Sequence, residues 1–217
     1  LSGVFEGKTT GAPLCAVIAN TDTRPQDYAR TKDLARPGHA DYPAHVRYQG
    51  YNDYRGGGHF SGRLTAPLVF AGAVAKQVLK PRGITVSARI SMLGGVKDPS
   101  ESQIEDIVLS AKQAGDSVGG TIACAVEGMP AGLGAPDFGC NVEGIFSQYL
   151  FAVPAVKGVA FGAGFALASM RGSEANDPFY MDGDTVKTRT NNAGGVNGGI
   201  TNGMPLTIEA VLRPTTS

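Results

Sequence analysis

The pattern of apolar and polar residues predicts helices in three stretches of the chain. Residues 64–79, LTAPLVFAGAVAKQVL, are apolar on nearly every face of a helical wheel, which predicts a helix buried on all sides. Residues 100–114 begin with Ser100 and acidic residues and end before Gly115, which predicts a helix with a serine cap. A third helix is predicted over residues 141–153, where a following proline stops it.

Shorter apolar runs between turn residues predict β-strands. A long polar loop at residues 21–41 separates the first of them from the helical stretches, and such loops are commonly functional. Strands and helices mix without strict alternation, so the pattern favours an α+β fold over a doubly wound parallel sheet. The predicted strands are 12–20, 84–93, 120–126 and 205–212, with a bent, glycine-interrupted strand pair at 156–170.

The composition indicates a globular chain without a general charge preference. Among 217 residues, 42% are hydrophobic, and 19 basic side chains balance 19 acidic ones. This balance predicts no attraction for nucleic acid or an anionic membrane, and the broken apolar runs predict neither a leader nor a membrane span. Cys15, Cys124 and Cys140 are far apart and lack metal-ligand spacing, so we interpret them as reduced, buried thiols of a cytosolic protein.

The stretch Asp53–Arg63, DYRGGGHFSGR, has the composition of a binding turn. Its three consecutive glycines, Gly56–Gly58, let the backbone approach a flat or anionic ligand. Ser61 can cap the helix that follows, and Arg63 lies in its first turn. Free N–H groups and the helix dipole favour a phosphate or carboxylate there. The spacing fits neither a Rossmann nor a P-loop fingerprint.

The three histidines allow different interpretations. His39 lies in the loop sequence RPGHAD, where it either transfers a proton near neutral pH or only hydrogen-bonds the backbone. His59 either contacts an anion or a ring, or fills space beside the glycines. His45 is interpreted as structural. The histidines lack zinc-site spacing and no G-x-S-x-G elbow is present, so the residues alone predict an anion-binding α+β domain without a metal.

Several long motifs, in order along the whole chain, resemble the central part of the chorismate synthase family. Together they are more specific than any one of them alone. The motifs are RPGHADY at 36–42, YRGGGHFSGRLTA at 54–66, GMPAGLGAPDF at 128–138, PAVKGVAFGAGF at 154–165, GSEANDPF at 172–179 and NNAGGVNGGITNGMPL at 191–206.

The resemblance implies a lyase of the shikimate pathway, and thus of aromatic amino acid biosynthesis. It would convert 5-enolpyruvylshikimate 3-phosphate to chorismate by 1,4-elimination of phosphate and a ring proton. It further implies reduced FMN as cofactor, a cytoplasmic homotetramer, and a layered β/α/α/β sandwich with buried helices between antiparallel sheets.

The motif matches also imply roles for individual residues. Arg36 and Arg63 match substrate-binding arginines, and His39 matches a catalytic histidine beside the flavin. The implied FMN contacts are His59, Phe60, Ser61, Pro154, Ala155, Gly198, Arg213, Pro214, Thr215, Thr216 and Ser217. A further, backbone-rich candidate for cofactor binding is the stretch Asn191, Asn192, Ala193, Gly194 and Gly195.

The chain departs from the family pattern in two ways. The family more commonly has arginine and serine at the positions of His59 and Phe60, and alanine at Gly62. Its amino-terminal HGESHG segment and its RHD-containing segment have no counterpart in these 217 residues. We therefore expect one core domain over 1–217, truncated at both ends. The alternatives to an active enzyme are an inactive core that binds flavin or phosphate weakly, and an unrelated phosphate-binding module.

Overall fold

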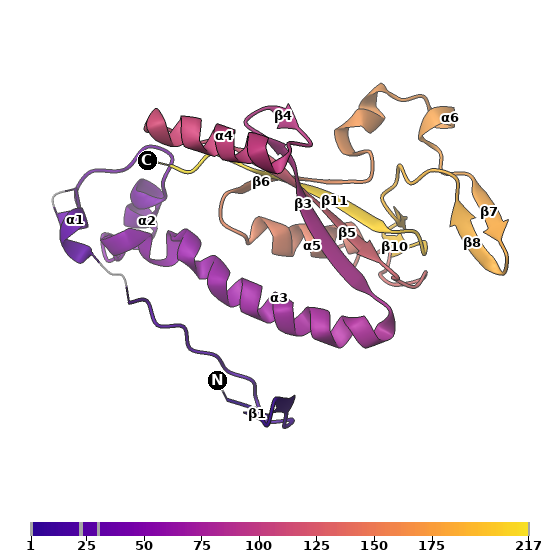
Figure 1. Cartoon of the computed structure of the whole chain (residues 1–217), viewed down its shortest axis with the longest axis horizontal. Helices are drawn as coiled ribbons and strands as arrows, with labels where there is room; N and C mark the ends of the chain where they lie inside the picture. Colours follow the sequence, from indigo (N-terminus) through magenta and orange to yellow (C-terminus); the bar gives the residue numbers. More distant parts are fainter. Residues whose placement is uncertain (1, 22–23, 30, 217) are drawn as a thin grey trace. The chain divides into compact units, whose positions relative to one another are not determined.

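The computed structural model describes residues 2–21, 24–29 and 31–216 and divides the chain into two compact units. The first unit comprises Leu1–Leu68 and the second Val69–Ser217. Helices and antiparallel sheets occur together (Figure 1), so the predicted α+β class is confirmed.

The first unit consists of short elements. Its strands pair as a small antiparallel hairpin, and its first helix contacts the glycine-rich turn. The elements are β1 (Val4–Phe5), β2 (Lys8–Thr9), α1 (Pro25–Ala29), α2 (Asp41–Arg47) and the 3₁₀ helices η1 (Arg55–Phe60) and η2 (Gly62–Leu64).

The strand predicted over residues 12–20 is wrong. A single bridge between Ser2 and Cys15 is the only ladder contact this stretch makes within the described residues, and Val17 is 87% exposed. An apolar run becomes a strand only when a neighbouring strand accepts its backbone hydrogen bonds. The sequence pattern alone does not reveal that partner.

Helix α3 (Thr65–Leu79) forms where it was predicted, but it is not buried on all sides. None of its residues is buried, and Leu68 and Val69 are 49% and 71% exposed. Its last residue, Leu79, packs against the core of the second unit, after which η3 (Lys80–Arg82) ends at Gly83 with a φ of 74°. The apolar composition of α3 predicted its helical structure but not its exposure.

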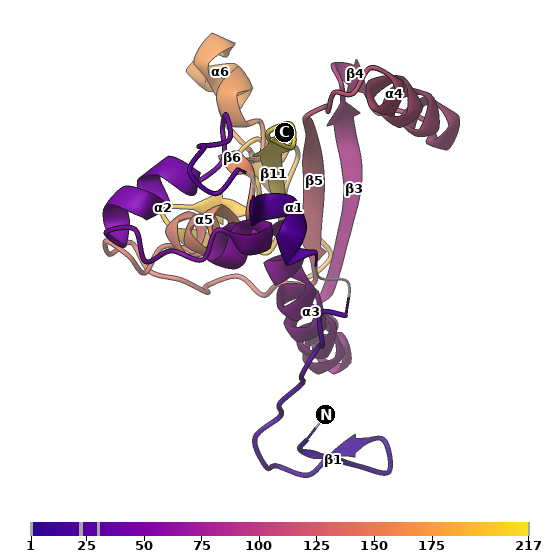
Figure 2. The ribbon, with the colours of Figure 1, turned by 90° about the vertical axis from the view of Figure 1, so that its left-hand side faces the viewer.

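The second unit is organised around a five-stranded antiparallel sheet with the order β4-β3-β5-β11-β6. Strand β11 is the last in sequence, yet it lies between β5 and β6 (Figure 2), pairing Ile208 with Cys124 on one side and with Phe161 on the other. The strands are β3 (Thr85–Leu93), β4 (Val96–Lys97), β5 (Gly120–Glu127), β6 (Val156–Phe161) and β11 (Leu206–Leu212).

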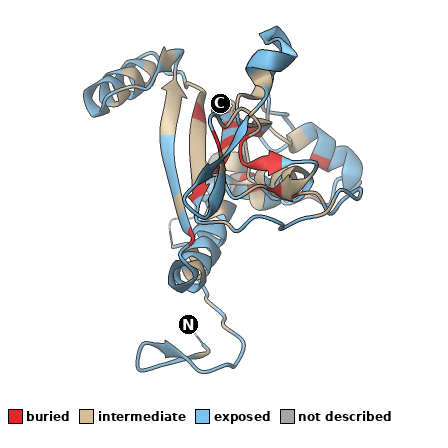
Figure 3. Ribbon diagram, turned by 90° about the vertical axis from the view of Figure 1, so that its right-hand side faces the viewer, coloured by how far each residue is buried: buried red, intermediate tan, exposed pale blue. Residues whose placement is uncertain are grey.

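One face of this sheet carries the core. Alternate residues of β11, Leu206, Ile208 and Ala210, are buried, as expected for a strand with one covered face (Figure 3). Helix α5 (Val142–Phe151) lies on that face against β6, because Val142, Phe146 and Leu150 recur at helical spacing and join the same cluster.

Helix α4 (Glu101–Gln113) confirms the prediction from its cap. The Ser100 hydroxyl accepts from the Gln103 backbone N–H at 3.3 Å, and the Gln103 side chain accepts from the Ser100 N–H at 2.9 Å. This reciprocal box satisfies two of the amide groups that a helix start leaves unpaired.

The predicted strand pair over residues 156–170 is wrong in its second half. Strand β6 ends at Phe161, and Gly162 and Gly164, with φ of 56° and 53°, turn the chain into η4 (Gly164–Ser169). The remaining elements are α6 (Gly172–Ala175), the hairpin β7 (Phe179–Asp182) and β8 (Thr185–Thr188), and the pair β9 (Val196–Asn197) and β10 (Ile200–Thr201).

The three cysteines are all free, but the prediction that they are buried fails for two of them. Cys15 and Cys140 are exposed, whereas Cys124 is half-buried in β5. Burial raises the pKa of the Cys124 thiol, which keeps it protonated and unreactive near neutral pH.

Among the residues that the structure describes, no helix is both long and apolar enough to cross a lipid bilayer.

Candidate functional site

The loop that precedes α2 closes on itself through one ion pair. Arg36 donates from Nε to Asp41 Oδ2 and from Nη2 to Asp41 Oδ1, both at 2.8 Å, and its backbone N–H donates to Oδ2 at 3.0 Å. Asp41 is the first residue of α2, where a carboxylate is favoured by the helix dipole. The turn is completed by Gly38, at a φ of 70°, and by the His39 N–H, which donates to the Arg36 carbonyl.

His39 is held inside this loop. Its Nδ1 lies 2.6 Å from Asp41 Oδ1 and 3.0 Å from Arg36 Nη2. The side chains of His39, Asp41 and Arg36 are 13%, 22% and 30% exposed, so the cluster is shielded but reachable from solvent. Arg36 and His39, two residues predicted to be functional, are therefore in direct contact.

The charge of Asp41 is fixed by its neighbours. The hydrogen bonds from Arg36, aided by His39, lower the pKa of Asp41 well below its ordinary value, despite partial burial. Asp41 likewise raises the pKa of Arg36. At neutral pH the cluster therefore holds a permanent carboxylate against a permanent guanidinium.

The glycine-rich turn lies directly beside His39. Gly57 is buried, and a Cβ at this position would lie 3.3 Å from His39 Nε2 and 3.7 Å from Ser61 Cβ. Ser61 was predicted to cap the long helix, but it caps the short η2 that precedes this helix, with its hydroxyl accepting from the Arg63 N–H at 3.2 Å. The turn thus places both Ser61 and the imidazole of His39 within 4 Å of the position that a side chain at Gly57 would occupy.

The other predicted residues of this turn are more exposed. His59, Phe60 and Arg63 are all on the surface of the first unit. Arg55 is engaged with Asp53, donating from Nε and Nη2 to the two carboxylate oxygens at 2.9 Å each. Arg63 is therefore the basic residue at the start of the helix in the position predicted for an anion contact.

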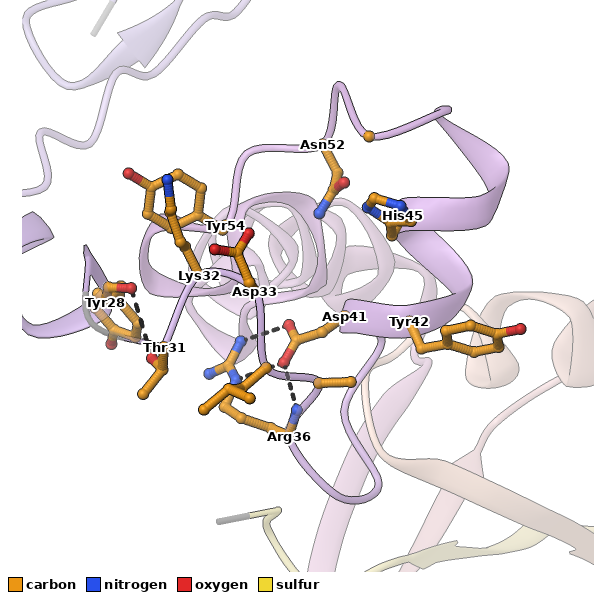
Figure 4. A pocket seen from close by; sticks show the side chains of 13 residues that line it. Tyr28, Thr31, Lys32, Asp33, Arg36, Asp41, Tyr42, His45, Asn52 and Tyr54 are labelled. Atoms are coloured by element: carbon orange, nitrogen blue, oxygen red, sulfur yellow. Dashed lines mark hydrogen bonds and ion pairs between the residues drawn. The ribbon is translucent and has the colours of Figure 1, made fainter.

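A pocket of about 470 Å³ opens next to the His39 loop within the first unit. Arg36 and Asp41 point toward each other on its wall (Figure 4). Tyr28 faces Arg36, with the guanidinium carbon 5.8 Å from the ring centroid. The lining also includes Lys32, Asp33, His45, Asn52 and Tyr54.

A second cluster lies in the second unit, in the turn at residues 190–195. Asp177 accepts from the Thr190 hydroxyl at 2.7 Å and from the backbone N–H groups of Asn192 and Ala193 at 2.8 Å each. Gly162 and Gly194 allow the turn to touch the end of β6, since a Cβ on Gly162 would lie 2.0 Å from the Asn192 carbonyl oxygen.

One polar atom in this turn has an unmet hydrogen bond. Asn191 Nδ2 donates to the Pro205 carbonyl at 2.8 Å, but Asn191 Oδ1 is buried and has no hydrogen-bond partner in the described structure. A buried carbonyl oxygen without a donor is costly. Nearby in sequence, Gly198 has a φ of 59° and open space where a side chain would be.

The remaining residues that were predicted to bind the cofactor lie near the C-terminal end of β11. The Arg213 N–H donates to the Ala155 carbonyl at 3.0 Å, so Pro154 and Ala155 adjoin the stretch 213–216. The Thr215 carbonyl accepts from Ser117 at 2.6 Å, and Ser217 lies outside the described residues. Residues 191–195 instead adjoin the start of β11, through the Thr207 N–H and the Gly194 carbonyl at 3.2 Å. The predicted cofactor residues of this unit therefore form two groups, one at each end of a strand.

Two acidic residues with central roles were missed by the sequence reasoning. Asp41 follows His39 by two residues in RPGHAD, and a carboxylate at that spacing is a common orienting partner for an imidazole. Asp177 belongs to the motif GSEANDPF and precedes a proline, a usual place for a side chain that accepts from turn amides. Within the described ranges, no group of three or more histidine, cysteine or acidic residues could hold a metal ion.

Comparisons with known proteins give one consistent result. The family model for chorismate synthase matches residues 1–217. A curated chorismate synthase of Chitinophaga pinensis is 50% identical over 216 residues, covering 100% of this chain and 62% of its own length. One from Thermococcus kodakarensis is 47% identical over 235 residues, covering 100% of this chain and 66% of its own length. The chain thus spans about two thirds of these relatives.

A solved structure agrees with the sequence comparisons. A crystal structure described as chorismate synthase superimposes with a TM-score of 0.73 at 25% sequence identity, covering 80% of this chain and 62% of that one.

Proposed function

Because the chain belongs to the chorismate synthase family, we propose that it converts 5-enolpyruvylshikimate 3-phosphate to chorismate. In this lyase reaction, phosphate and a ring proton leave the substrate and a double bond forms, with no net oxidation. The observation that carries the proposal is the His39 loop, where an imidazole, a guanidinium and a glycine turn meet. This grouping offers a proton-transfer group in contact with Arg36 and Asp41, which line the pocket of the first unit.

The substrate carries a phosphate and carboxylates, which require cationic groups at its site. Arg63 is exposed at the start of α3 and is our candidate for the phosphate. Arg36 has Nε and Nη2 engaged with Asp41, so it would reach substrate through Nη1. Arg36 lines the pocket of the first unit, which supports this assignment.

Reduced FMN is the cofactor that we propose. When bound, it supplies an electron-rich ring that can lend an electron as phosphate departs. Two features of the second unit fit such a group: the unpartnered Asn191 Oδ1 is suited to an N–H donor, and the open space at Gly198 suits a close approach to the backbone.

The proposed function can be tested with the 217-residue chain under anaerobic conditions. Substrate and reduced FMN are added, and phosphate release and chorismate absorbance are followed together. We expect His39→Gln to slow turnover by about 10²-fold or more, since general acid–base groups typically contribute that much. Arg63→Gln should mainly raise KM. Arg89→Gln is the control: Arg89 lies on β3 and forms an exposed ion pair with Asp98, and its loss should leave both parameters unchanged.

The same assay separates catalysis from the inactive-core alternative. If no phosphate is released but flavin binding is seen by fluorescence, the proposed reaction is contradicted and FMN binding is still supported. Absence of both would contradict the cofactor as well.

We propose that the protein assembles as a homotetramer in the cytoplasm. The exposed apolar surface of α3 supports self-association, because a monomer would leave it in water. Cys15, Cys124 and Cys140 are all free, which supports a reducing compartment. Light scattering on the purified chain tests the assembly.

A further inference from the structure

The hydrogen-bond partners of His39 restrict where its proton can reside. Nδ1 faces two groups, the carboxylate of Asp41 at 2.6 Å and the guanidinium of Arg36 at 3.0 Å. A carboxylate only accepts and a guanidinium only donates, so Nδ1 can satisfy one of them at a time.

The geometry favours the bond to Asp41. Arg36 Nη2 already donates to Asp41 Oδ1 at 2.8 Å, so it does not require the imidazole lone pair. If Nδ1 lacked its proton, its lone pair would face a carboxylate oxygen at 2.6 Å, which is strongly repulsive. A proton on Nδ1 turns the same contact into a short, charge-assisted hydrogen bond.

We propose that Asp41 is a positioning residue that fixes neutral His39 as the Nδ1–H tautomer and leaves Nε2 as its proton-transfer atom. Arg36 supports this arrangement, because its two side-chain bonds and its backbone bond fix the orientation of the Asp41 carboxylate. The assignment of Nε2 to the reaction rests on the proposed function. The tautomer itself does not.

The surroundings of Nε2 fit this assignment. Nε2 faces Gly57, where a Cβ would lie only 3.3 Å away, so the absence of a side chain leaves this nitrogen approachable. The two ring nitrogens thus differ in their partners: Nδ1 lies 2.6 Å from Asp41 Oδ1, whereas Nε2 lies beside Gly57 and 3.4 Å from Arg36 Nη2, a group that only donates. Fixing one nitrogen to orient the other is a common way of preparing an imidazole for proton transfer.

The tautomer can be measured directly by nitrogen NMR of histidine-labelled protein. The chain has three histidines, so His45→Gln and His59→Gln variants are enough to assign the signals of His39. In the unsubstituted protein, we expect the neutral imidazole of His39 to have a protonated Nδ1 and an unprotonated Nε2. A His39 that is protonated on Nε2, or that exchanges evenly between tautomers, would overturn the proposal.

The Asp41→Asn variant tests whether Asp41 fixes the tautomer of His39. The amide oxygen is expected to turn toward the Arg36 donors, which places the amide NH₂ against Nδ1 and imposes the Nε2–H tautomer. Asp53→Asn removes a carboxylate that bonds Arg55 rather than His39, and should leave the His39 signals unchanged. Circular dichroism confirms that both variants fold. A folded Asp41→Asn protein with unchanged His39 nitrogen shifts would rule out the positioning role.

The kinetic measurement separates this inference from the proposed function. If the unsubstituted chain forms chorismate, Asp41→Asn should lower kcat by about 10²-fold with a smaller change in KM. An unchanged kcat together with an inverted tautomer would overturn the role of Asp41 in the reaction. If the unsubstituted chain forms no chorismate, the proposed function fails, whereas the NMR result still decides the tautomer.

Discussion

At the scale of single residues, Gly57 shows how an absent side chain shapes the site. Its φ of 83° is a left-handed conformation that residues with a Cβ adopt only at a cost, and a methyl group there would lie in tight contact with His39, 3.3 Å from Nε2. Both constraints apply at one position of the three-glycine run.

We therefore expect Gly57→Ala to lower the free energy of unfolding by about 1–3 kcal/mol, from backbone strain and contact with His39 Nε2. Urea denaturation measures the change. Gly62→Ala is the matched control, since no atom lies within 4 Å of the place that its methyl group would occupy and its φ is not left-handed. The control should change stability by less than about 0.5 kcal/mol. Equal losses in the two variants would contradict the argument.

The carboxylate of Asp177 is expected to make the stability of the folded state depend on pH. Burial raises its pKa, but the hydrogen bonds from Ala193, Thr190 and Asn192 lower it more, so the pKa lies below its ordinary value. A carboxyl group with a lowered pKa stabilises the folded state above the pKa of the unfolded chain, about 3.9, and this contribution is lost as pH falls further.

Asp177→Asn should accordingly cost about 2–4 kcal/mol at pH 7, because one acceptor is lost and an NH₂ group faces backbone donors. Urea denaturation at pH 7, 5 and 3 should show similar differences at the two higher values and a smaller one at pH 3. Asp184→Asn, in the exposed turn between β7 and β8, provides the control. A difference that grows toward pH 3 would have the wrong sign.

The candidate site was only partly predictable from its residues. Arg36 and His39 were predicted as functional, and the structure places them in contact. Asp41 and Asp177 were missed because acidic residues in polar loops are common, and only the folded loop shows which amides and side chains they accept from. Short-range patterns specify a residue type, whereas a hydrogen-bond partner depends on the path of the chain.

At the scale of elements, β11 carries the best-buried residue of the second unit. Leu206 is 1% exposed and packs with Val126, Val142 and Ile208 from β5, α5 and β11 itself. The start of α5 and the two central strands β5 and β11 therefore share one contact region.

Leu206→Ala should reduce the free energy of unfolding by about 2–5 kcal/mol, the usual range for creating a cavity in a packed core. Val211→Ala, on the opposite face of β11 and 42% exposed, should cost less than about 1 kcal/mol. Denaturant titrations of both variants measure the contrast. Comparable losses of unfolding free energy in the two variants would show that both faces of β11 are equally buried.

Elements with local start and stop signals were predicted well. The capping box at Ser100 defined α4, and the apolar period defined α3, although not its exposure. The hairpin at residues 179–188 was missed, even though Gly183 and Asp184 separate two short alternating segments, a recognised hairpin signal. The strand predicted over residues 12–20 did not form. A strand there would need a partner strand, and no local sequence signal specifies one.

At the scale of the whole molecule, the exposed surface of α3 makes assembly testable. Val69→Glu places a charge where the side chain is 71% exposed, so the substitution should be tolerated by the fold of one chain. If α3 is covered in the assembly, the charge would be buried and the oligomer weakened.

We expect Val69→Glu to lower the molar mass measured by light scattering toward that of the monomer. Val17→Glu, at a side chain 87% exposed in the first unit, should leave the mass unchanged. If Val69→Glu leaves the molar mass unchanged, α3 is not part of the interface. If the unsubstituted protein is a monomer, the proposed assembly is wrong.

The place of β11 between β5 and β6 has a consequence for synthesis on the ribosome. Both neighbours emerge long before the strand that joins them, so the nascent chain exposes two unpaired strand edges until Leu206–Leu212 has left the exit tunnel. Such late closure of non-local pairs is slow and invites aggregation. Yield in a heterologous host should therefore respond to translation speed and to the supply of chaperones.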